Sequence, residues 1–205
     1  TATTEIYTLS LHDALPISVS YDPEGAKKLL EESGWTDTDG DGYVDKDGQK
    51  LSINWLTYPT RLEQPKLAEY AQATLKDIGI DVVVNNTSDH MTIAKNGDFD
   101  VYVSSTTTAP TGDPEYFFTS TVTGAKNYGN YQNEEVTKLT DQLHQTFDKD
   151  ERAKLAVELQ QDILDDDAFF FVSHLNMGIV TKSNVTGMAA HPCDYYEITA
   201  DLDVE

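Results

Sequence analysis

Residues 21–59, YDPEGAKKLLEESGWTDTDGDGYVDKDGQKLSINWLTYP, decide the fold of this 205-residue chain. Asp22 is a suitable helix N-cap, Pro23 fits the first helical turn, and Ser33-Gly34 ends the helix. A polar loop rich in Asp and Gly comes next. Residues 51–56 then alternate between inward-facing Leu51, Ile53 and Trp55 and outward-facing Ser52, Asn54 and Leu56, which predicts a strand with one buried face. The order is therefore helix, acidic turn and strand.

The acidic turn carries the sharpest local motif of the chain. Carboxylates stand at alternate positions, a glycine follows where a calcium loop needs its sharp turn, and the ninth position is again Asp. The twelfth position is Gly48 instead of Glu and a strand follows it, which disfavours an EF-hand. A hairpin turn in which Asp side chains accept backbone N–H bonds and glycines supply positive φ is the favoured interpretation, with a weak structural calcium site as the alternative. The residues that would ligate a structural calcium ion are Asp37, Asp39, Asp41, Tyr43 and Asp45.

The chain after this stretch predicts an α/β sheet. A helix ending at Gly79 is followed by a strand over 80–84, a short helix over 88–94 and a strand over 99–104. Strand, helix and strand in this order predict a right-handed βαβ unit with parallel strands. Ligands of open α/β sheets bind beyond the carboxyl ends of the strands. That rule indicates the loops that begin at Tyr58, Asn85 and Ser105.

Two helices and two strands are predicted further on. One helix has the apolar stripe Val136, Leu139, Leu143 and Phe147, and the other has Leu155, Leu159 and Ile163, with a turn at 148–150 between them. Residues 168–174, AFFFVSH, and 177–183, MGIVTKS, predict the strands.

These elements in this order resemble the family 5 extracellular solute-binding proteins of ABC importers, the peptide/nickel group. The resemblance rests on YDPEGAKKLLEESGW, the DGDG turn, the strand and LAEYAQATLKDIGIDV, and it extends from about Val19 to the C-terminus. It implies a lobe of a type II periplasmic-binding-protein fold, with a mixed, mainly parallel sheet flanked by helices. Residues 19–167 would form the ligand-binding lobe, lobe II, and residues 168–205 would return towards lobe I.

The resemblance also implies a function. Such proteins capture a solute between two lobes by hinge closure and deliver it to the membrane permease of an ABC importer. The expected location is extracellular, as a cell-surface lipoprotein, or periplasmic.

Residues 1–17, TATTEIYTLSLHDALPI, have neither the charge asymmetry nor the apolar core of a signal peptide. They read as the translation of a DNA sequencing adapter, so residues 1–18 are expected to be a non-native segment, with a native strand and loop as the alternative. We accordingly expect the true N-terminus to be missing. Since closure needs both lobes, the chain alone is expected to bind nickel chelates and peptides weakly or not at all.

Composition excludes several classes of protein. The net charge of -22 disfavours nucleic acid and anionic membranes as partners. No run of 18 apolar residues is present, so no membrane span is predicted, and the single Cys193 excludes an internal disulfide. The histidines are scattered without zinc or nucleophile motifs, so no catalytic residue is predicted and the chain is not expected to be an enzyme.

The loop at 104–118, SSTTTAPTGDPEYFF, corresponds in the resembling family to a segment that lines the cleft. Its threonine hydroxyls can donate and accept hydrogen bonds, whereas Asp113 can instead cap a helix and its aromatic residues can belong to the core. Arg61 could pair with a carboxylate of a chelator, or could be a solvent-exposed residue at a helix start. The predicted ligand-binding residues are Tyr58, Arg61, Thr106, Thr107, Thr108, Asn127 and Tyr128.

Departures from the family pattern bear on the ligand. Peptide binders carry an acidic residue in this loop, but there is none around Pro110 and Thr111. Nickel-chelate binders have aromatic residues where this chain has Thr108 and Gly112, and a histidine where it has Ala125-Lys126. We expect a small polar solute, with nickel or another metal held by an organic chelator favoured and a di- or oligopeptide as the alternative. No cofactor is required. A calcium-dependent interaction module is the competing class of function, and a hydrolase is the third.

Overall fold

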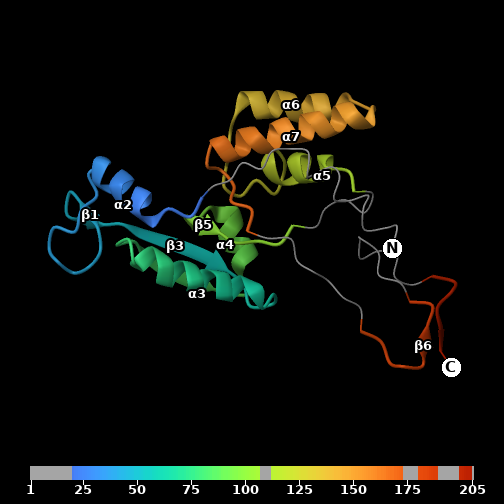
Figure 1. Cartoon of the computed structure of the whole chain (residues 1–205), viewed down its shortest axis with the longest axis horizontal. Helices are drawn as coiled ribbons and strands as arrows, with labels where there is room; N and C mark the ends of the chain where they lie inside the picture. The colour runs from blue at the N-terminus through green and yellow to red at the C-terminus, as the bar shows by residue number, and fades with distance from the viewer. Residues whose placement is uncertain (1–19, 107–111, 173–179, 189–198, 205) are drawn as a thin grey trace. The chain divides into compact units, whose positions relative to one another are not determined.

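The computed structural model describes residues 20–106, 112–172, 180–188 and 199–204 (Figure 1). The chain divides into two compact units, which we call the sheet unit, Ser18–Ser105, and the helical unit, within Thr106–Glu205. The predicted segments 1–18, 19–167 and 168–205 stay predictions.

A three-stranded parallel sheet forms the centre of the sheet unit. Strand β3 (Ser52–Thr57) lies between β4 (Asp81–Asn86) and β5 (Val101–Tyr102), and is parallel to both. Helix α3 (Glu63–Lys76) connects β3 to β4 and lies along the sheet, and helix α4 (His90–Asn96) connects β4 to β5 (Figure 1). The parallel pairing predicted from the order of elements is confirmed.

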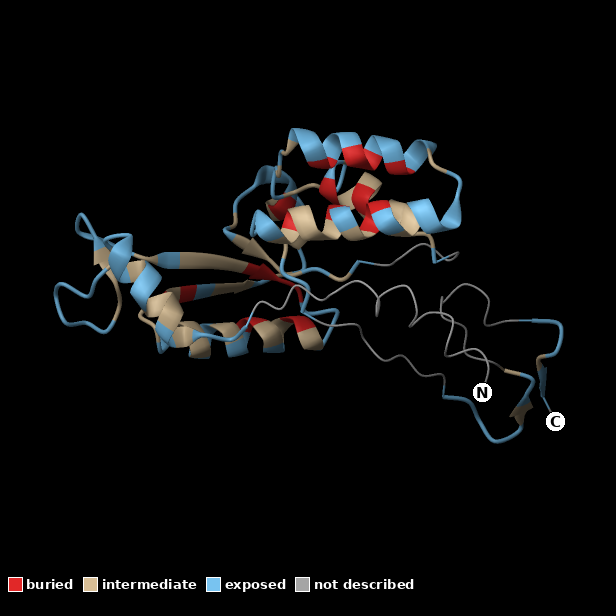
Figure 2. Cartoon of the chain, turned by 45° about the horizontal axis from the view of Figure 1, so that its top comes forward, coloured by how far each residue is buried: buried red, intermediate tan, exposed pale blue. Residues whose placement is uncertain are grey.

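Burial along β3 differs from the prediction of one buried face. Leu56 was expected to point outward, but Leu56, Thr57 and Tyr58 are all buried (Figure 2). Successive strand residues point to opposite faces, so both faces are covered at this end of the central strand. Neighbouring residues therefore cover both faces of β3 at its carboxyl end, which is the end where α/β sheets bind ligands.

Helix α2 (Pro23–Glu32) begins and ends as predicted. The Asp22 carboxylate accepts a hydrogen bond from the Gly25 backbone N–H at 2.9 Å, and Gly34 has a φ of +85° just beyond the helix. The acidic turn then leads into a hairpin of β1 (Asp45–Lys46) and β2 (Gln49–Lys50).

The hairpin docks on the turn before β4. The Val44 backbone N–H donates to the Gly79 carbonyl at 2.8 Å. Gly79 has a φ of +82°, and a Cβ atom there would lie 2.9 Å from the Val44 Cγ1 atom. Only glycine combines this backbone conformation with so close an approach.

Four helical segments make the described core of the helical unit. They are α5 (Glu115–Phe117), the π-helix η1 (Phe118–Val122), α6 (Glu134–Gln145) and α7 (Lys149–Asp165). Both predicted apolar stripes are buried, except that Phe147 is 92% exposed. That part of the prediction is wrong because α6 ends at Gln145 and Thr146 is extended, with φ -96° and ψ 126°, so Phe147 leaves the helical spacing. The core consists of Phe118, Val122, Val136, Leu139, Leu143, Leu155, Ala156, Leu159 and Ile163.

Other element boundaries shift. The helix predicted over 88–94 is α4 at His90–Asn96, and the strand predicted over 99–104 is paired only at Val101–Tyr102. Two strands were predicted over 168–174 and 177–183. Their described residues, 168–172 and 180–183, form no strand, and the rest of both segments lies outside the described residues. Strand β6 (Val185–Thr186) pairs instead with β7 (Asp203–Val204). In the described part of the chain, no helix combines the length and the hydropathy needed to cross a membrane.

Candidate functional site

Polar and aromatic side chains gather where the parallel strands end. We call Tyr58, Gln64, His90, Tyr102 and Ser105 the strand-end cluster. Tyr58 directly follows β3, Gln64 lies in the first turn of α3, and His90 begins α4 after β4. Tyr102 ends β5, and Ser105 lies in the loop beyond it. The cluster therefore occupies the edge at which α/β sheets bind ligands.

Hydrogen bonds and ring contacts join the cluster into one continuous group. The His90 ring stacks on the Tyr58 ring with centroids 4.1 Å apart, and the His90 Nδ1 atom lies 2.7 Å from the Tyr102 hydroxyl. The Ser105 backbone N–H donates to the Tyr58 hydroxyl at 3.3 Å, and the Gln64 Nε2 atom donates to the Ser105 hydroxyl at 2.8 Å. These contacts fix both the loop that leaves β5 and the start of α4.

Buried polar atoms without partners lie at the same edge. The Thr57 hydroxyl, the Glu63 Oε1 atom and the Gln64 Oε1 atom are buried and have no hydrogen-bond partner among the described residues, and the Trp55 indole N–H within β3 is a fourth such atom. Thr57 is 0% exposed and Gln64 is 3% exposed. A buried polar group without a partner costs about 1–3 kcal/mol, so an ordered water molecule or a ligand is expected to complete the bonding here.

The predicted ligand-binding residues do not all lie at this edge. Tyr58 belongs to the strand-end cluster, Thr106 is exposed directly beyond Ser105, and Thr107 and Thr108 lie outside the described residues. Arg61 is exposed, and no hydrogen bond or ion pair joins it to a described residue.

Two further predicted residues, Asn127 and Tyr128, lie in the helical unit. The Asn127 amide donates to the Tyr131 carbonyl at 2.8 Å and accepts from the Tyr131 backbone N–H at 3.0 Å. Asn127 therefore closes its own loop. Its role in binding stays a prediction, as does that of Tyr128.

His90 is the residue that sequence reasoning missed. It was counted among scattered histidines because no motif surrounds it. The available signal was its place, five residues after Asn85, in a loop that the strand-end rule had already indicated. Of the other histidines, His12, His174 and His191 lie outside the described residues.

The acidic turn of the sheet unit is tightly hydrogen-bonded. Asp37 accepts the backbone N–H groups of Gly40 at 2.7 Å and Gly42 at 3.0 Å, and both glycines have positive φ. Asp45 accepts the Thr38 hydroxyl at 2.7 Å and the Thr38 N–H at 2.8 Å, and this hydroxyl bond is the main reason that the pKa of Asp45 is lowered. The carboxylates of Asp37 and Asp45 thus accept backbone N–H bonds, as expected for a hairpin turn that needs no metal ion.

Part of the same turn also has the geometry of a cation site. Carboxylate oxygens of Asp37, Asp39 and Asp45 all lie within 4.8 Å of one another. Asp41 is not in this group and accepts the Tyr43 backbone N–H at 2.9 Å. Calcium binding stays a prediction.

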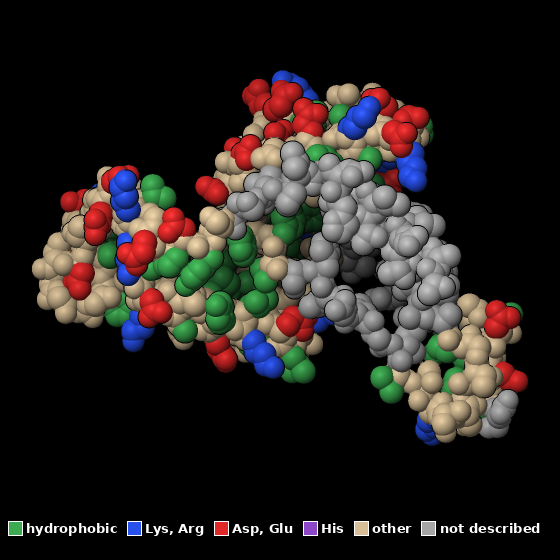
Figure 3. Space-filling model, in the orientation of Figure 1, with side chains coloured by type: hydrophobic (Ala, Val, Ile, Leu, Met, Phe, Trp, Pro, Cys, Tyr) green, Lys and Arg blue, Asp and Glu red, His purple; other side chains and the backbone are tan. Residues whose placement is uncertain are grey.

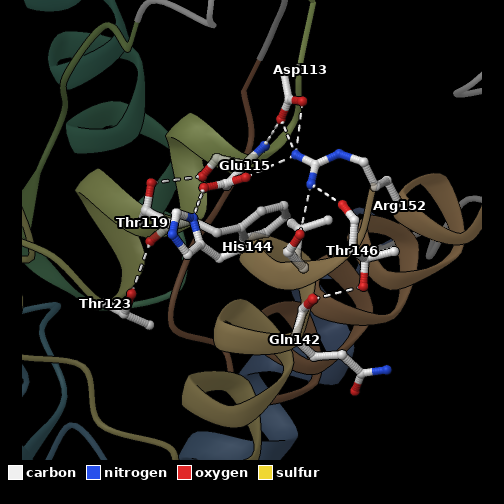
Figure 4. A network of polar contacts seen from close by, with 10 residues as sticks. Asp113, Glu115, Thr119, Thr123, Gln142, His144, Thr146 and Arg152 are labelled. Atoms are coloured by element: carbon white, nitrogen blue, oxygen red, sulfur yellow. Dashed lines mark hydrogen bonds and ion pairs between the residues drawn. The ribbon is translucent and has the colours of Figure 1, made fainter. Parts of the chain in front are cut away.

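A network around Arg152 holds the helical unit together (Figure 4). Its Nη2 atom contacts both Asp113 oxygens at 2.7 Å and the Glu115 Oε2 atom at 2.8 Å. Its Nη1 atom donates to the carbonyls of Leu143 and Thr146, each at 2.6 Å, which satisfies the carbonyl end of α6. One side chain from α7 therefore joins α5 to the end of α6.

Glu115 lies between two basic groups in this network. His144 contacts its other oxygen at 2.6 Å, and the pKa of Glu115 is lowered first by the bond from Arg152 and then by the bond from His144. Asp113 also accepts the Glu115 backbone N–H at 2.9 Å, although the N-cap position of the short helix α5 is Pro114. Phe118 is in the core as predicted, whereas Tyr116 is 43% exposed.

Acidic side chains, with lysines among them, spread over α6 and α7 (Figure 3). Lys138 pairs with Glu135 at 3.0 Å and Lys154 with Glu151 at 3.4 Å, all on exposed surface. Such pairs contribute little to stability and keep the surface hydrated.

Comparison with known proteins places this fold among solute-binding proteins. Residues 3–129 match the family model described as bacterial extracellular solute-binding proteins, family 5 middle. The oligopeptide-binding protein AppA of Bacillus subtilis is 30% identical over 184 residues, which cover 87% of this chain and 34% of AppA. The nickel-binding periplasmic protein of Escherichia coli is 26% identical over 181 residues, covering 84% of this chain and 34% of that protein.

Solved structures agree. AppA in complex with a nonapeptide has a TM-score of 0.62 at 29% identity, covering 76% of this chain and 33% of AppA. NikA of Staphylococcus aureus in complex with Ni(L-His)2 has a TM-score of 0.64 at 29% identity, covering 75% of this chain and 31% of NikA. These neighbours have the type II periplasmic-binding-protein fold. The chain spans about a third of the length of these relatives, and it belongs to the family 5 bacterial extracellular solute-binding proteins.

Proposed function

We propose that the chain forms part of the solute receptor of an ABC importer and that the strand-end cluster contributes to its ligand site. Proteins of this family are extracellular or periplasmic substrate-binding components that work with ABC permeases. The observation that carries the proposal for the site is the set of buried, unpartnered atoms on Thr57, Glu63 and Gln64 beside the cluster. A folded protein keeps such atoms at a cost, and a polar solute would supply the missing partners.

The proposed ligand is a small polar solute, with a metal chelate favoured and an oligopeptide as the second candidate. Four relatives are named for oligopeptides, one is named for dipeptides and two are named for nickel, which supports both candidates. Arg61 and Thr106 are exposed next to the cluster in sequence and are proposed to contact the ligand, Arg61 through a carboxylate of the chelator. The receptor is further proposed to be extracellular, anchored as a cell-surface lipoprotein, or periplasmic. The chain is proposed to have no catalytic role.

Calcium in the acidic turn is proposed as structural support only. The convergence of Asp37, Asp39 and Asp45 favours a cation there. The turn joins the hairpin, which contacts the chain just before β4, so a bound ion would strengthen that end of the sheet.

Thr57→Val tests the proposed site. Valine keeps the shape and suits a strand, and it removes a buried hydroxyl that has no partner, so the free energy of unfolding should rise by about 1 kcal/mol. Loss of a hydroxyl that bonds the solute should weaken binding about fivefold or more. Binding of triglycine and of the nickel bis-histidine complex would be followed by NMR, which detects weak association. Thr60→Val, at an exposed position near the same strand end, is the matched control. A more stable variant that binds both probes as well as the wild type would refute the role of this edge.

A further inference from the structure

Strand β4 lies at an edge of the three-stranded sheet. It pairs with β3 on one side, and no strand of the described chain pairs with its other side. The backbone N–H of Asp81, its first residue, donates to the Leu51 carbonyl at 3.0 Å and so points towards β3. Along a strand the backbone groups of successive residues point alternately to the two sides, so every second residue of β4 points outward. The outward residues are Val82, Val84 and Asn86.

The sequence of β4 lacks the usual protections of an edge strand. Proteins commonly protect such edges with lysine, proline or a bulge, because an open edge can pair with a strand of another molecule. The strand reads DVVVNN, its register with β3 is continuous, and its central Val83 is 52% exposed. Its charged residue, Asp81, is paired with Lys50 at 3.5 Å. The strand by itself is therefore well suited to pairing.

A side chain from helix α3 covers part of this edge. The Gln72 Nε2 atom donates to the Val82 carbonyl at 2.6 Å, and Val82 is 3% exposed. Both residues line a hollow of about 240 Å³ between α3 and β4, so the carbonyl would face open space without the amide. Within the described chain, no hydrogen bond reaches the outward backbone groups of Val84 and Asn86. Gln72 thus makes the contact that closes the edge.

The open edge is complementary to itself. If two β4 strands pair in antiparallel fashion about Val84, that residue lies opposite the same residue of the second copy, and Val82 lies opposite Asn86. Facing residues of such pairs exchange both of their backbone hydrogen bonds. The outer pairs therefore need the Val82 carbonyl as an acceptor, and the Gln72 amide already occupies it.

We propose that Gln72 blocks the open edge of β4 against pairing with the β4 strand of a second copy of this chain. This role goes beyond the proposed function and is independent of the solute. The net charge of -22 also opposes self-association, and it acts on every surface of the molecule. Salt at about 0.5 M screens that repulsion and leaves the contribution of Gln72 to be measured.

Sedimentation of the 205-residue chain in about 0.5 M sodium chloride tests the block. Gln72 is an exposed residue of α3, and alanine suits a helix, so Gln72→Ala should fold and should dimerise at least about tenfold more tightly than the wild type. Gln160→Ala is the matched control, because the Gln160 Nε2 atom also donates to a backbone carbonyl, that of Ala156 at 3.1 Å, but within helix α7. Dimerisation of Gln72→Ala no tighter than that of the wild type would overturn the proposal, as would equal association of Gln160→Ala.

Amide hydrogen exchange followed by NMR locates the pairing. In the wild type the Val83 amide, which points towards β3, should exchange slowly, and the outward Val84 amide should exchange fast. In Gln72→Ala the Val84 amide should become protected as the protein concentration rises. A Val84 amide already protected in the dilute wild type would mean that the edge is closed without Gln72. Association of Gln72→Ala that leaves Val84 unprotected would place the contact on another surface, and either result would refute the block.

Discussion

Replacing Arg152 by methionine should destabilise the helical unit by about 3 kcal/mol. The substitution removes the bonds to both carboxylates and to the two α6 carbonyls, and a hydrogen bond to a charged group contributes about 1.5–3 kcal/mol. The full sum does not apply, because the side chains of Asp113 and Glu115 are 38% and 22% exposed and water replaces part of what is lost. With a urea m-value of about 1.5 kcal/mol/M, the midpoint should fall by about 2 M.

The two units offer separate probes for this measurement. Both tryptophans, Trp35 and Trp55, lie in the sheet unit, so their fluorescence reports on that unit, while circular dichroism follows the helices of both units. Arg152→Met should lower the midpoint of the part of the circular dichroism transition that does not coincide with the fluorescence transition, and should leave the fluorescence transition in place. Arg152→Lys keeps the charge without the planar fork and should fall between methionine and wild type.

Lys154→Met is the matched control on the same helix. Its side chain is 74% exposed and pairs only with Glu151 at 3.4 Å, so the expected change is within about 0.5 kcal/mol. Equal destabilisation by Lys154→Met and Arg152→Met would refute the role assigned to the network.

Two further predictions concern titrating groups, and a third concerns calcium binding in the acidic turn. The folded-state pKa of Glu115 is lowered, chiefly by the bond from Arg152, so its contribution to stability is present above the unfolded value near 4.5 and is lost as pH falls through the folded value. Glu115→Gln should therefore flatten the pH dependence of the stability of the helical unit below about pH 4.5. Burial raises the pKa of Tyr131 to about 12, helped by its bond to Asp166, so ultraviolet titration should show one late-ionising tyrosine that disappears in Tyr131→Phe. Excess calcium should raise the melting temperature of the sheet unit in the wild type and not in Asp39→Asn, which keeps the backbone bonds of Asp37; an equal rise in both would refute the cation site.

Local chemistry made much of the fold predictable. Asp22, Pro23 and Gly34 delimit a helix by rules that depend only on neighbours in the chain, and the structure follows them. The parallel sheet followed from the order of strands and helices, because a crossover helix leaves little other choice.

The failures arise where tertiary context overrides a local pattern. Leu56 was placed outside because alternation assumes one solvated face, and a central strand has none at its buried end. Phe147 continued a helical spacing in sequence, but Arg152 caps the α6 carbonyls from another helix and the chain turns away at Thr146. Neither outcome can be read from residues near those positions.

The candidate site was predictable in location more than in detail. The strand-end rule named the loops after Tyr58, Asn85 and Ser105, and the cluster lies there. His90 and Gln64 were not singled out, because their places in the cluster depend on contacts between distant parts of the chain. His90 stacks on Tyr58, and Gln64 bonds Ser105 across 41 residues.

The hairpin that follows the acidic turn contacts Gly79, at the end of the sheet unit opposite to the strand-end cluster. Gly79 lies before the start of β4, whereas the strand-end cluster follows the carboxyl ends, and a six-residue strand is about 20 Å long. A luminescent lanthanide or a grafted epitope in the acidic turn would therefore report on folding without obstructing the proposed ligand site. Engineering of a biosensor from this scaffold can tune its robustness at one end of the sheet and its selectivity at the other.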